Sequence, residues 1–147
     1  MRYFSAMAGW EIGGSVNACR VEINNDLDIV AARAEARKLA QDMGFDIIDQ
    51  ARIATVISEL ARNVVLHAHC GQVVMERIQV GEKVGIQIVC EDQGPGIGDP
   101  EEILQADEAR EGGTHVGLVG TKRLMDDLEI ESHAGLGTVV RVRRWLS

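Results

Sequence analysis

The feature that most limits the fold of this chain is a pair of apolar stretches separated by a three-residue turn. Residues 72–80 and 84–91 are rich in Val and Ile, and Gly81, Glu82 and Lys83 join them. β-Branched residues favour strands, and a short connection that contains glycine favours a hairpin. The sequence therefore predicts an antiparallel ribbon in the middle of the chain, against which the other elements must pack.

Two helices are expected before this hairpin. Residues 28–43 are rich in alanine, with Asp26 as the candidate N-terminal cap and Gly44 as the C-terminal stop. A longer helix should begin after Asp46 and run toward Gly71, because its apolar residues recur every three or four positions. The expected buried face of this second helix consists of Ile47, Ala51, Ala54, Ile57, Ala61, Val64 and Ala68.

The remaining elements complete a mixed architecture. Strands are expected over 16–24, 129–133 and 138–146, a short helix near 101–106 and a longer helix over 118–127. Strands outnumber crossover helices, which predicts a two-layer α/β sandwich with a mixed, mostly antiparallel sheet and its helices on one face. We expect one domain over residues 1–147, with 1–14 as a loosely attached N-terminal segment.

Alternation along the last strand places Arg141 and Arg143 on one face, which we expect to be solvated. Together with Arg144, they form the one local concentration of positive charge, near the C-terminus. The formal net charge is -8, and a protein that binds nucleic acid usually presents a basic surface. A nucleic-acid partner is therefore not expected.

Composition also limits the cellular setting. Three cysteines are too few, and odd in number, for a disulfide framework, which favours a reducing cytoplasm. No stretch reaches the about 18 continuous apolar residues that a membrane span needs. The first residues lack the basic segment and apolar run of an export signal, so we expect a cytoplasmic protein without a membrane partner.

Glu59 and Asn63 lie four residues apart on the predicted second helix. Their side chains should project from one face about 5–6 Å apart. A carboxylate and an amide oxygen suit Mg²⁺, which takes its other ligands from water and phosphates. Alternatively, Glu59 accepts a proton, or both residues belong to an exposed polar stripe of the helix.

Asp92 ends a Val/Ile-rich strand and is followed by a segment with Gly94, Gly96 and Ile97. Glycines allow a flat ring or a phosphate to approach the main chain. A carboxylate at this point can accept a hydrogen bond from an exocyclic amine such as that of adenine. Taken alone, however, Gly-Pro-Gly indicates only a turn.

A second glycine-rich segment, 112–120, runs into a predicted helix start that carries Lys122 in its first turns. Free N–H groups and the positive end of a helix dipole favour a phosphate at such a junction. The segment matches neither the Walker pattern nor the glycine pattern of a Rossmann fold.

In combination these motifs resemble the GHKL ATPase superfamily, in which an N box, two glycine boxes and a late Gly-Thr occur in this order. The corresponding segments are the helical Glu-x₃-Asn at 59–63, Asp-x-Gly-x-Gly at 92–96, the glycine-rich segment 112–120 and Gly137-Thr138. The resemblance extends from about Ile23 to Leu146. Within the superfamily the chain is most similar to RsbT-type serine/threonine switch kinases, relatives of the anti-sigma factor kinases RsbW and SpoIIAB. The residues that carry this closer similarity are 58–63, 91–97, 122–126 and 144–146.

This resemblance implies the Bergerat fold and a site for ATP with Mg²⁺. Glu59 would be the general base, Asn63 would hold Mg²⁺, Asp92 would bind the adenine amine and Thr138 would support the Asp92 end of the pocket. The other nucleotide-binding candidates are Gly94, Gly96, Ile97, Gly113, His115, Val116, Gly117 and Lys122.

The resemblance also implies an activity and partners. The chain would phosphorylate Ser or Thr on STAS-domain proteins of the RsbS/RsbR type in a partner-switching stress or sigma-factor pathway, and would then activate a PP2C-type, RsbU-like phosphatase. The alternative is an anti-sigma factor or a nucleotide-gated binding module with little catalysis. Glu59 favours the enzyme, whereas His115, where RsbT-type sequences usually have glycine, favours the binding module. Homodimerisation is left open.

His67, His69 and Cys70 are all capable of binding zinc, but their spacing matches no common zinc motif. His67 also matches a histidine that often follows the N box, where it looks structural. A zinc site is not predicted.

Overall fold

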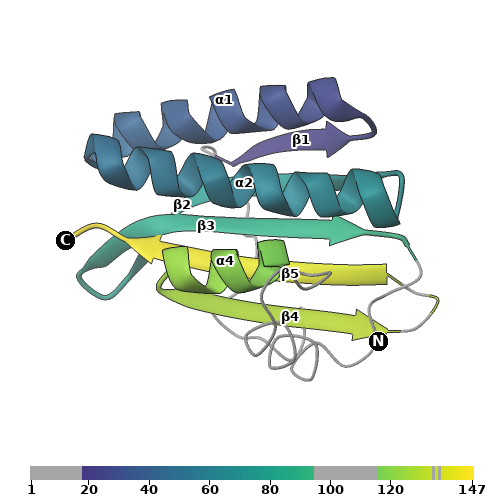
Figure 1. Cartoon of the computed structure of the whole chain (residues 1–147). Coiled ribbons are helices and arrows are strands. Elements are labelled where there is room, and N and C mark those ends of the chain that lie inside the picture. The colour runs from purple at the N-terminus through teal and green to yellow at the C-terminus, as the bar shows by residue number, and fades with distance from the viewer. Residues whose placement is uncertain (1–17, 95–115, 134, 136) are drawn as a thin grey trace.

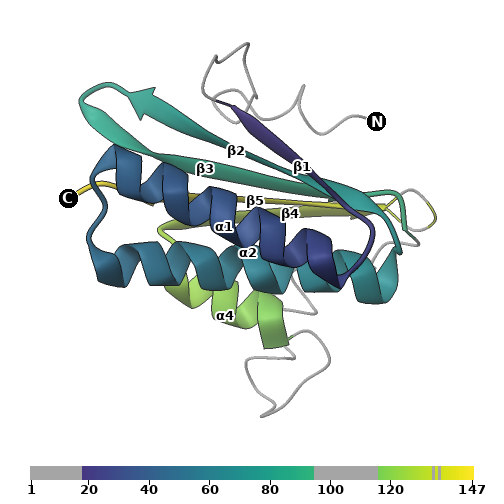
Figure 2. The same ribbon diagram turned by 90° about the horizontal axis from the view of Figure 1, so that it is seen from above.

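The computed structural model describes residues 18–94, 116–133, 135 and 137–147. Within these residues, five strands form one sheet in the order β1-β2-β3-β5-β4, and three helices cover one of its faces (Figures 1 and 2). The elements in chain order are β1 (Cys19–Ile23), α1 (Asp26–Met43), α2 (Ile47–His67), β2 (Gly71–Val80), β3 (Lys83–Asp92), α4 (Val116–Leu124), β4 (Asp127–His133) and β5 (Gly137–Trp145). The predicted two-layer α/β architecture is confirmed.

The predicted hairpin is formed by β2 and β3, which pair from Gly71 opposite Asp92 to Val80 opposite Lys83. The other neighbouring strands of the sheet also pair antiparallel. β3 lies between β2 and β5, so it carries hydrogen bonds along both edges. The register of β3 therefore determines which residues of β2 and β5 lie directly opposite each residue of β3.

The N-terminal cap of helix α1 lies one residue earlier than expected. The cap is Asn25, whose side chain accepts a hydrogen bond from the Asp28 N–H at 3.2 Å, while the Asp28 carboxylate accepts from the Asn25 N–H at 3.3 Å. Asp26 is the first helical residue, so its assignment as the cap was wrong. The reciprocal bonds satisfy two N–H groups at the helix start, which Asp26 alone would not do. Gly44 ends the helix as predicted, in the left-handed conformation with φ 96°.

Asp46 caps α2 as predicted, accepting from the Asp49 N–H at 2.7 Å. The predicted buried face was wrong in its first turns, since Ile47 is 71% exposed and Ala51 is also exposed. α2 packs between α1 and α4 and against the sheet, so its buried stripe is wider than a one-sided periodicity indicates. The fully buried residues of α2 are Ile53, Ala54, Val56, Ile57, Leu60, Ala61 and Val64.

The side chains of Arg141 and Arg143 are not solvated. Arg141 is 1% exposed and Arg143 is 8% exposed, which corrects the expectation from the sequence. The Arg143 Nε donates to Gln87 Oε1 at 2.9 Å, and the Gln87 Nε2 donates to Glu76 Oε1 at 3.4 Å. Strand alternation specifies which side chains share a face but not whether that face meets water. Burial raises the pKa of Glu76 and lowers the pKa of Arg143.

A second polar network joins the end of β5 to two other elements. Arg144 forms ion pairs with Asp49 of α2 at 3.0 Å and with Asp126, between α4 and β4, at 3.3 Å. The Trp145 N–H donates to Asp126 at 2.8 Å, and the Lys83 Nζ lies 5.5 Å from the centre of the Trp145 ring. These contacts hold the start of α2, the end of β5 and the turn before β4 together.

Several expected boundaries differ from those observed. α4 starts at Val116 and ends at Leu124, and β4 begins at Asp127, so both lie about two residues earlier than expected. The expected helix near 101–106 and the segment 1–14 lie outside the described residues. In the described part of the chain, no helix is both long and apolar enough to cross a membrane.

Arg144→Met should lower the free energy of unfolding by about 1 kcal/mol, because a partly buried arginine loses two carboxylate partners. Arg52→Met is the matched control, since Arg52 pairs with the same Asp49 oxygen at 3.0 Å but is more exposed. The control should cost about 0.3 kcal/mol. Urea unfolding measures both, and equal losses would contradict a linking role for Arg144.

Candidate functional site

The ends of three elements, α2, β3 and β5, lie together at one end of the molecule. Figure 1 shows the C-terminal ends of α2 and β3 beside the start of β5. The pairing of Glu91 with Val139 and of His133 with Gly137 sets these ends level with one another. The fold thus brings the C-terminal end of α2, the Asp92 end of β3 and Thr138 together (Figure 1).

Asp92 is the best-defined group of the site. Its Oδ1 atom accepts hydrogen bonds from the Gly94 N–H at 2.9 Å and from the Thr138 N–H at 3.3 Å. The pKa of the half-buried carboxyl is raised by burial, against the opposing effects of these two hydrogen bonds and of His67. Within the described residues the Oδ2 atom accepts no hydrogen bond. One oxygen is therefore fixed by the fold, while within the described residues the other keeps its full capacity to accept a hydrogen bond.

The two glycines around Asp92 are required by close packing. A Cβ atom on Gly94 would lie 2.6 Å from the Cβ of Ala68, just past the end of α2. Gly137 has φ +105°, and a Cβ atom there would overlap the carbonyl oxygen of Asp92. Side chains at these positions would therefore displace either the end of α2 or the end of β3.

Thr138 contributes through its backbone and through its side chain. Its N–H bonds to Asp92, and its hydroxyl lies 3.1 Å from the Ser132 hydroxyl on β4. Thr138 is only 8% exposed. β3, β5 and β4 are thus connected by polar contacts beside the Asp92 carboxylate.

Glu59 and Asn63 lie on α2, both partly exposed. In the described part of the chain, neither side chain forms a hydrogen bond or an ion pair. The adjacent Leu60 faces the sheet, where its carbonyl accepts from the Cys90 Sγ at 3.7 Å. The carboxylate and the amide are therefore held on a packed helix, and the described residues leave their hydrogen-bonding capacity unused.

α4 corrects one expectation about the second glycine-rich segment. The helix begins at Val116, so Lys122 lies in its last turn and is exposed, not in its first turn. At 1.5 Å per residue, Lys122 is about 9 Å along the axis from Val116. Packing against α2 accounts for helical structure in a segment that contains Gly117 and Gly120.

The direction of α4 follows from its C-terminal connection. The Asp126 N–H donates to the Arg143 carbonyl, near the end of β5, at 2.9 Å. The C-terminal end of α4 therefore lies far from Asp92. The N-terminal end of α4 points back toward the C-terminal end of β3, which carries Asp92 (Figure 1). Val116 and Gly117 form that first turn.

Four other candidates lie outside the described residues, so their roles stay predictions. They are Gly96, Ile97, Gly113 and His115.

Two contributions to the site were not predicted from the sequence. Gly137 itself supports the site, and His67 lowers the pKa of the Asp92 carboxyl, against the effect of burial. The Gly-Thr pair at a strand start was the available signal for Gly137. No signal in the sequence placed His67 near Asp92.

Comparison with known proteins gives a consistent result. Residues 23–144 match the family described as the histidine kinase-like ATPase domain. The chain is 46% identical over 126 residues to the serine/threonine-protein kinase RsbT of Bacillus subtilis (strain 168), covering 86% of this chain and 95% of that protein. It is 30% identical over 124 residues to an anti-sigma F factor of Thermoanaerobacter sp. (strain X514), covering 78% and 83%. It is 29% identical over 101 residues to an anti-sigma F factor of Heyndrickxia coagulans, covering 63% and 67%.

Gly137→Ala should cost about 2 kcal/mol more of unfolding free energy than Gly135→Ala. Both glycines have positive φ, but a Cβ atom at Gly135 meets nothing within 4 Å, whereas one at Gly137 meets the Asp92 carbonyl. The pair separates backbone strain from the overlap with β3. Denaturant unfolding is the measurement, and equal costs would show that the overlap is relieved without loss.

Proposed function

This chain belongs to the histidine kinase-like ATPase domain family and is a serine/threonine protein kinase of the GHKL type, and we propose that it phosphorylates a STAS-domain regulator in a partner-switching pathway. ATP is the phosphoryl donor. The observation that carries the proposal is the Asp92 carboxylate, with one oxygen fixed by Gly94 and Thr138 and the other without a partner in the described residues. In this proposal residues 1–147 form a single kinase domain.

The Asp92 Oδ2 atom accepts a hydrogen bond from the exocyclic amine of adenine in this proposal. An ionised carboxylate is an acceptor only, so it favours an amine over the carbonyl that guanine carries at the same ring position. Gly94, Gly96 and Ile97 line the base, and Thr138 holds the Asp92 end of the pocket. The hydrogen bond from the Gly94 N–H to Asp92 Oδ1 at 2.9 Å supports this assignment, because it holds the Gly94 backbone beside the carboxylate.

The phosphates lie between α2 and the start of α4 in this proposal. The orientation of α4 supports a phosphate site, because helix N-terminal N–H groups attract anions. Gly113, His115, Val116 and Gly117 contact the phosphates, while Lys122 acts from farther along the helix.

Asn63 fits a magnesium ligand, because its amide oxygen has no partner in the described residues. No group of three or more His, Cys, Asp or Glu side chains in the described residues is placed to hold a metal ion. Mg²⁺ usually completes its coordination with water and phosphate oxygens, so Asn63 and ATP suffice. Mg²⁺ bound in this way neutralises phosphate charge during transfer.

Glu59 is the general base in this proposal. Its carboxylate takes the proton of the acceptor hydroxyl as the hydroxyl oxygen attacks the γ-phosphorus and ADP departs. The base must come within about 3 Å of that hydroxyl. The absence of a competing partner for Glu59 in the described residues supports this role.

The partners follow from the same relationship. We propose an RsbS/RsbR-like STAS scaffold as acceptor and, after release from it, a PP2C-type, RsbU-like phosphatase as the protein that the kinase activates. The similarity to anti-sigma F factors favours a second candidate, a nucleotide-gated module that sequesters a regulator with little catalysis. The two candidates differ in whether a phosphoryl group is transferred.

Asp92→Asn should abolish binding of a non-hydrolysable ATP analogue, measured by isothermal titration calorimetry, because the amide offers a donor as well as an acceptor to the adenine amine. The folded-state pKa of Asp92 is raised, so the ionised group opposes folding at neutral pH. The variant should therefore be at least as stable as the parent at pH 7. This advantage should disappear as the pH falls below about 4, where the unfolded carboxyl is also protonated. Unchanged nucleotide affinity would contradict the pocket assignment.

Glu59→Gln should keep nucleotide affinity but lower phosphoryl transfer to the acceptor by about 10²- to 10⁴-fold, since it removes the base alone. Glu35→Gln on α1 is the control, with the same charge change on an exposed helical residue. Single-turnover transfer of radiolabelled phosphate from ATP to STAS-domain proteins is the measurement. Transfer by Glu59→Gln within about twofold of the parent would remove Glu59 as base and favour the binding module.

A further inference from the structure

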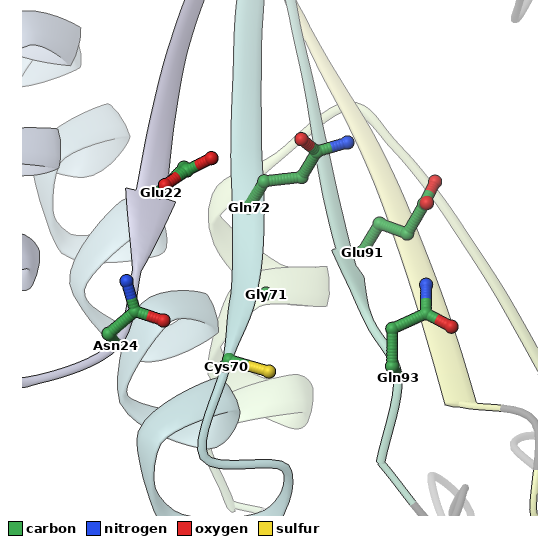
Figure 3. A pocket seen from close by; sticks show the side chains of 7 residues that line it. All are labelled: Glu22, Asn24, Cys70, Gly71, Gln72, Glu91 and Gln93. Atoms are coloured by element: carbon green, nitrogen blue, oxygen red, sulfur yellow. The ribbon is translucent and has the colours of Figure 1, made fainter.

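The sheet face opposite the helices carries a cavity of about 340 Å³ at the end of β1, β2 and β3. This volume is at the lower end of ligand sites, which suits a single long side chain better than a large cofactor. Figure 3 shows its lining side chains on the three neighbouring strands and their ends. They are Glu22, Asn24, Cys70, Gly71, Gln72, Glu91 and Gln93.

The register of the strands builds this cavity. Glu22 lies directly opposite Gln72, and Gln72 lies directly opposite Glu91. Neighbouring strands are about 4.8 Å apart, so the backbones of the two glutamates are about 10 Å apart with the Gln72 amide between them. The row thus presents a carboxylate on each side of an amide.

Alternation along β3 separates the cavity from the nucleotide pocket. Cys90 contacts Leu60 on the helical side of the sheet, so Glu91 faces the other side and Asp92 the helical side again. The cavity and the Asp92 site therefore lie back to back on consecutive residues. A group bound in the cavity does not compete with a nucleotide for space.

The polar groups of the cavity have spare hydrogen-bonding capacity. Within the described residues, no side-chain hydrogen bond or ion pair involves Glu22, Gln72, Glu91 or Gln93. Glu22 and Glu91 are the charged residues among those that line the cavity, so the cavity itself attracts a positively charged group.

We propose that this cavity binds the guanidinium group of an arginine side chain on a protein partner. Guanidinium carries five N–H donors in a planar fork and no acceptor, which matches two carboxylates flanking an amide carbonyl. A lysine ammonium is a compact charge and meets widely spaced carboxylates less well. We assign the guanidinium to a protein because the cavity volume of about 340 Å³ suits one long side chain. Its polar lining side chains lie together at the ends of the three strands (Figure 3).

The test titrates the full chain with the capped peptide acetyl-Ala-Arg-Ala-amide and follows backbone amide shifts by NMR. The amides of Glu22, Gln72 and Glu91 should shift in one saturable process, and the dissociation constant should rise with salt. The same peptide with citrulline, which is neutral and nearly isosteric, should bind at least tenfold more weakly. Equal binding of the citrulline peptide would overturn the proposal.

The Glu22→Gln/Glu91→Gln variant should bind the arginine peptide about tenfold more weakly than the parent, because it removes both charged acceptors. Glu82→Gln, in the exposed β2–β3 turn, is the charge-matched control and should not change the affinity. Each single variant repeats the measurement with a smaller change, and a dispersed amide spectrum shows that each variant is folded. Equal affinities for the double variant and the control would overturn the assignment of these carboxylates.

Two further arms separate the source of the ligand and its relation to ATP. Free arginine should bind no more tightly than the capped peptide, and a tenfold preference for free arginine would overturn the protein source. The peptide affinity should be the same with and without a saturating ATP analogue, since the sites lie on opposite faces. Binding of the peptide does not require a nucleotide. The arginine-site proposal therefore still holds if the proposed kinase activity fails its own test.

Discussion

The alternation of side chains along β3 is the constraint on which the rest of the structure depends. This strand is hydrogen-bonded along both edges, so its register also assigns the residues of β2 and β5 to one face or the other. Cys90 faces α2, whereas Gln87 faces the opposite side. A shift of one residue in the pairing of β3 would exchange the two faces and bury charged groups against the helices. It would also move the Asp92 carboxylate away from the Thr138 N–H.

Local physical rules account for what could be predicted from the sequence. Periodicity and turn chemistry identified the hairpin, the helices and the stop at Gly44, and the order of elements indicated the layered architecture. The errors arose where a local rule competes with a neighbour. Asp26 and Asn25 are both good caps, and only the reciprocal bonds with Asp28 select Asn25. Burial of Arg141 depends on what covers the sheet, which alternation does not specify.

The candidate site was predictable in its residue types but not in its connections. The motif order indicated Glu59, Asn63 and Asp92 together, yet it did not reveal that the Thr138 backbone bonds the Asp92 carboxylate. Such contacts depend on the register between β3 and β5, and Asp92 and Thr138 lie 46 residues apart in the sequence. The raised pKa of Asp92 shows that the fold holds this carboxyl where its charge is poorly solvated. A carboxyl with a perturbed pKa is a candidate functional group, in keeping with the binding role that we propose for Asp92.

Cys90 offers a way to observe the two layers of the fold. Its thiol is buried between β3 and α2, and burial and the nearby carboxylates raise its pKa, so it reacts only when the chain opens. Cys70, by contrast, is exposed. The rate at which a thiol reagent modifies Cys90, relative to Cys70, therefore measures how often the helical layer separates from the sheet.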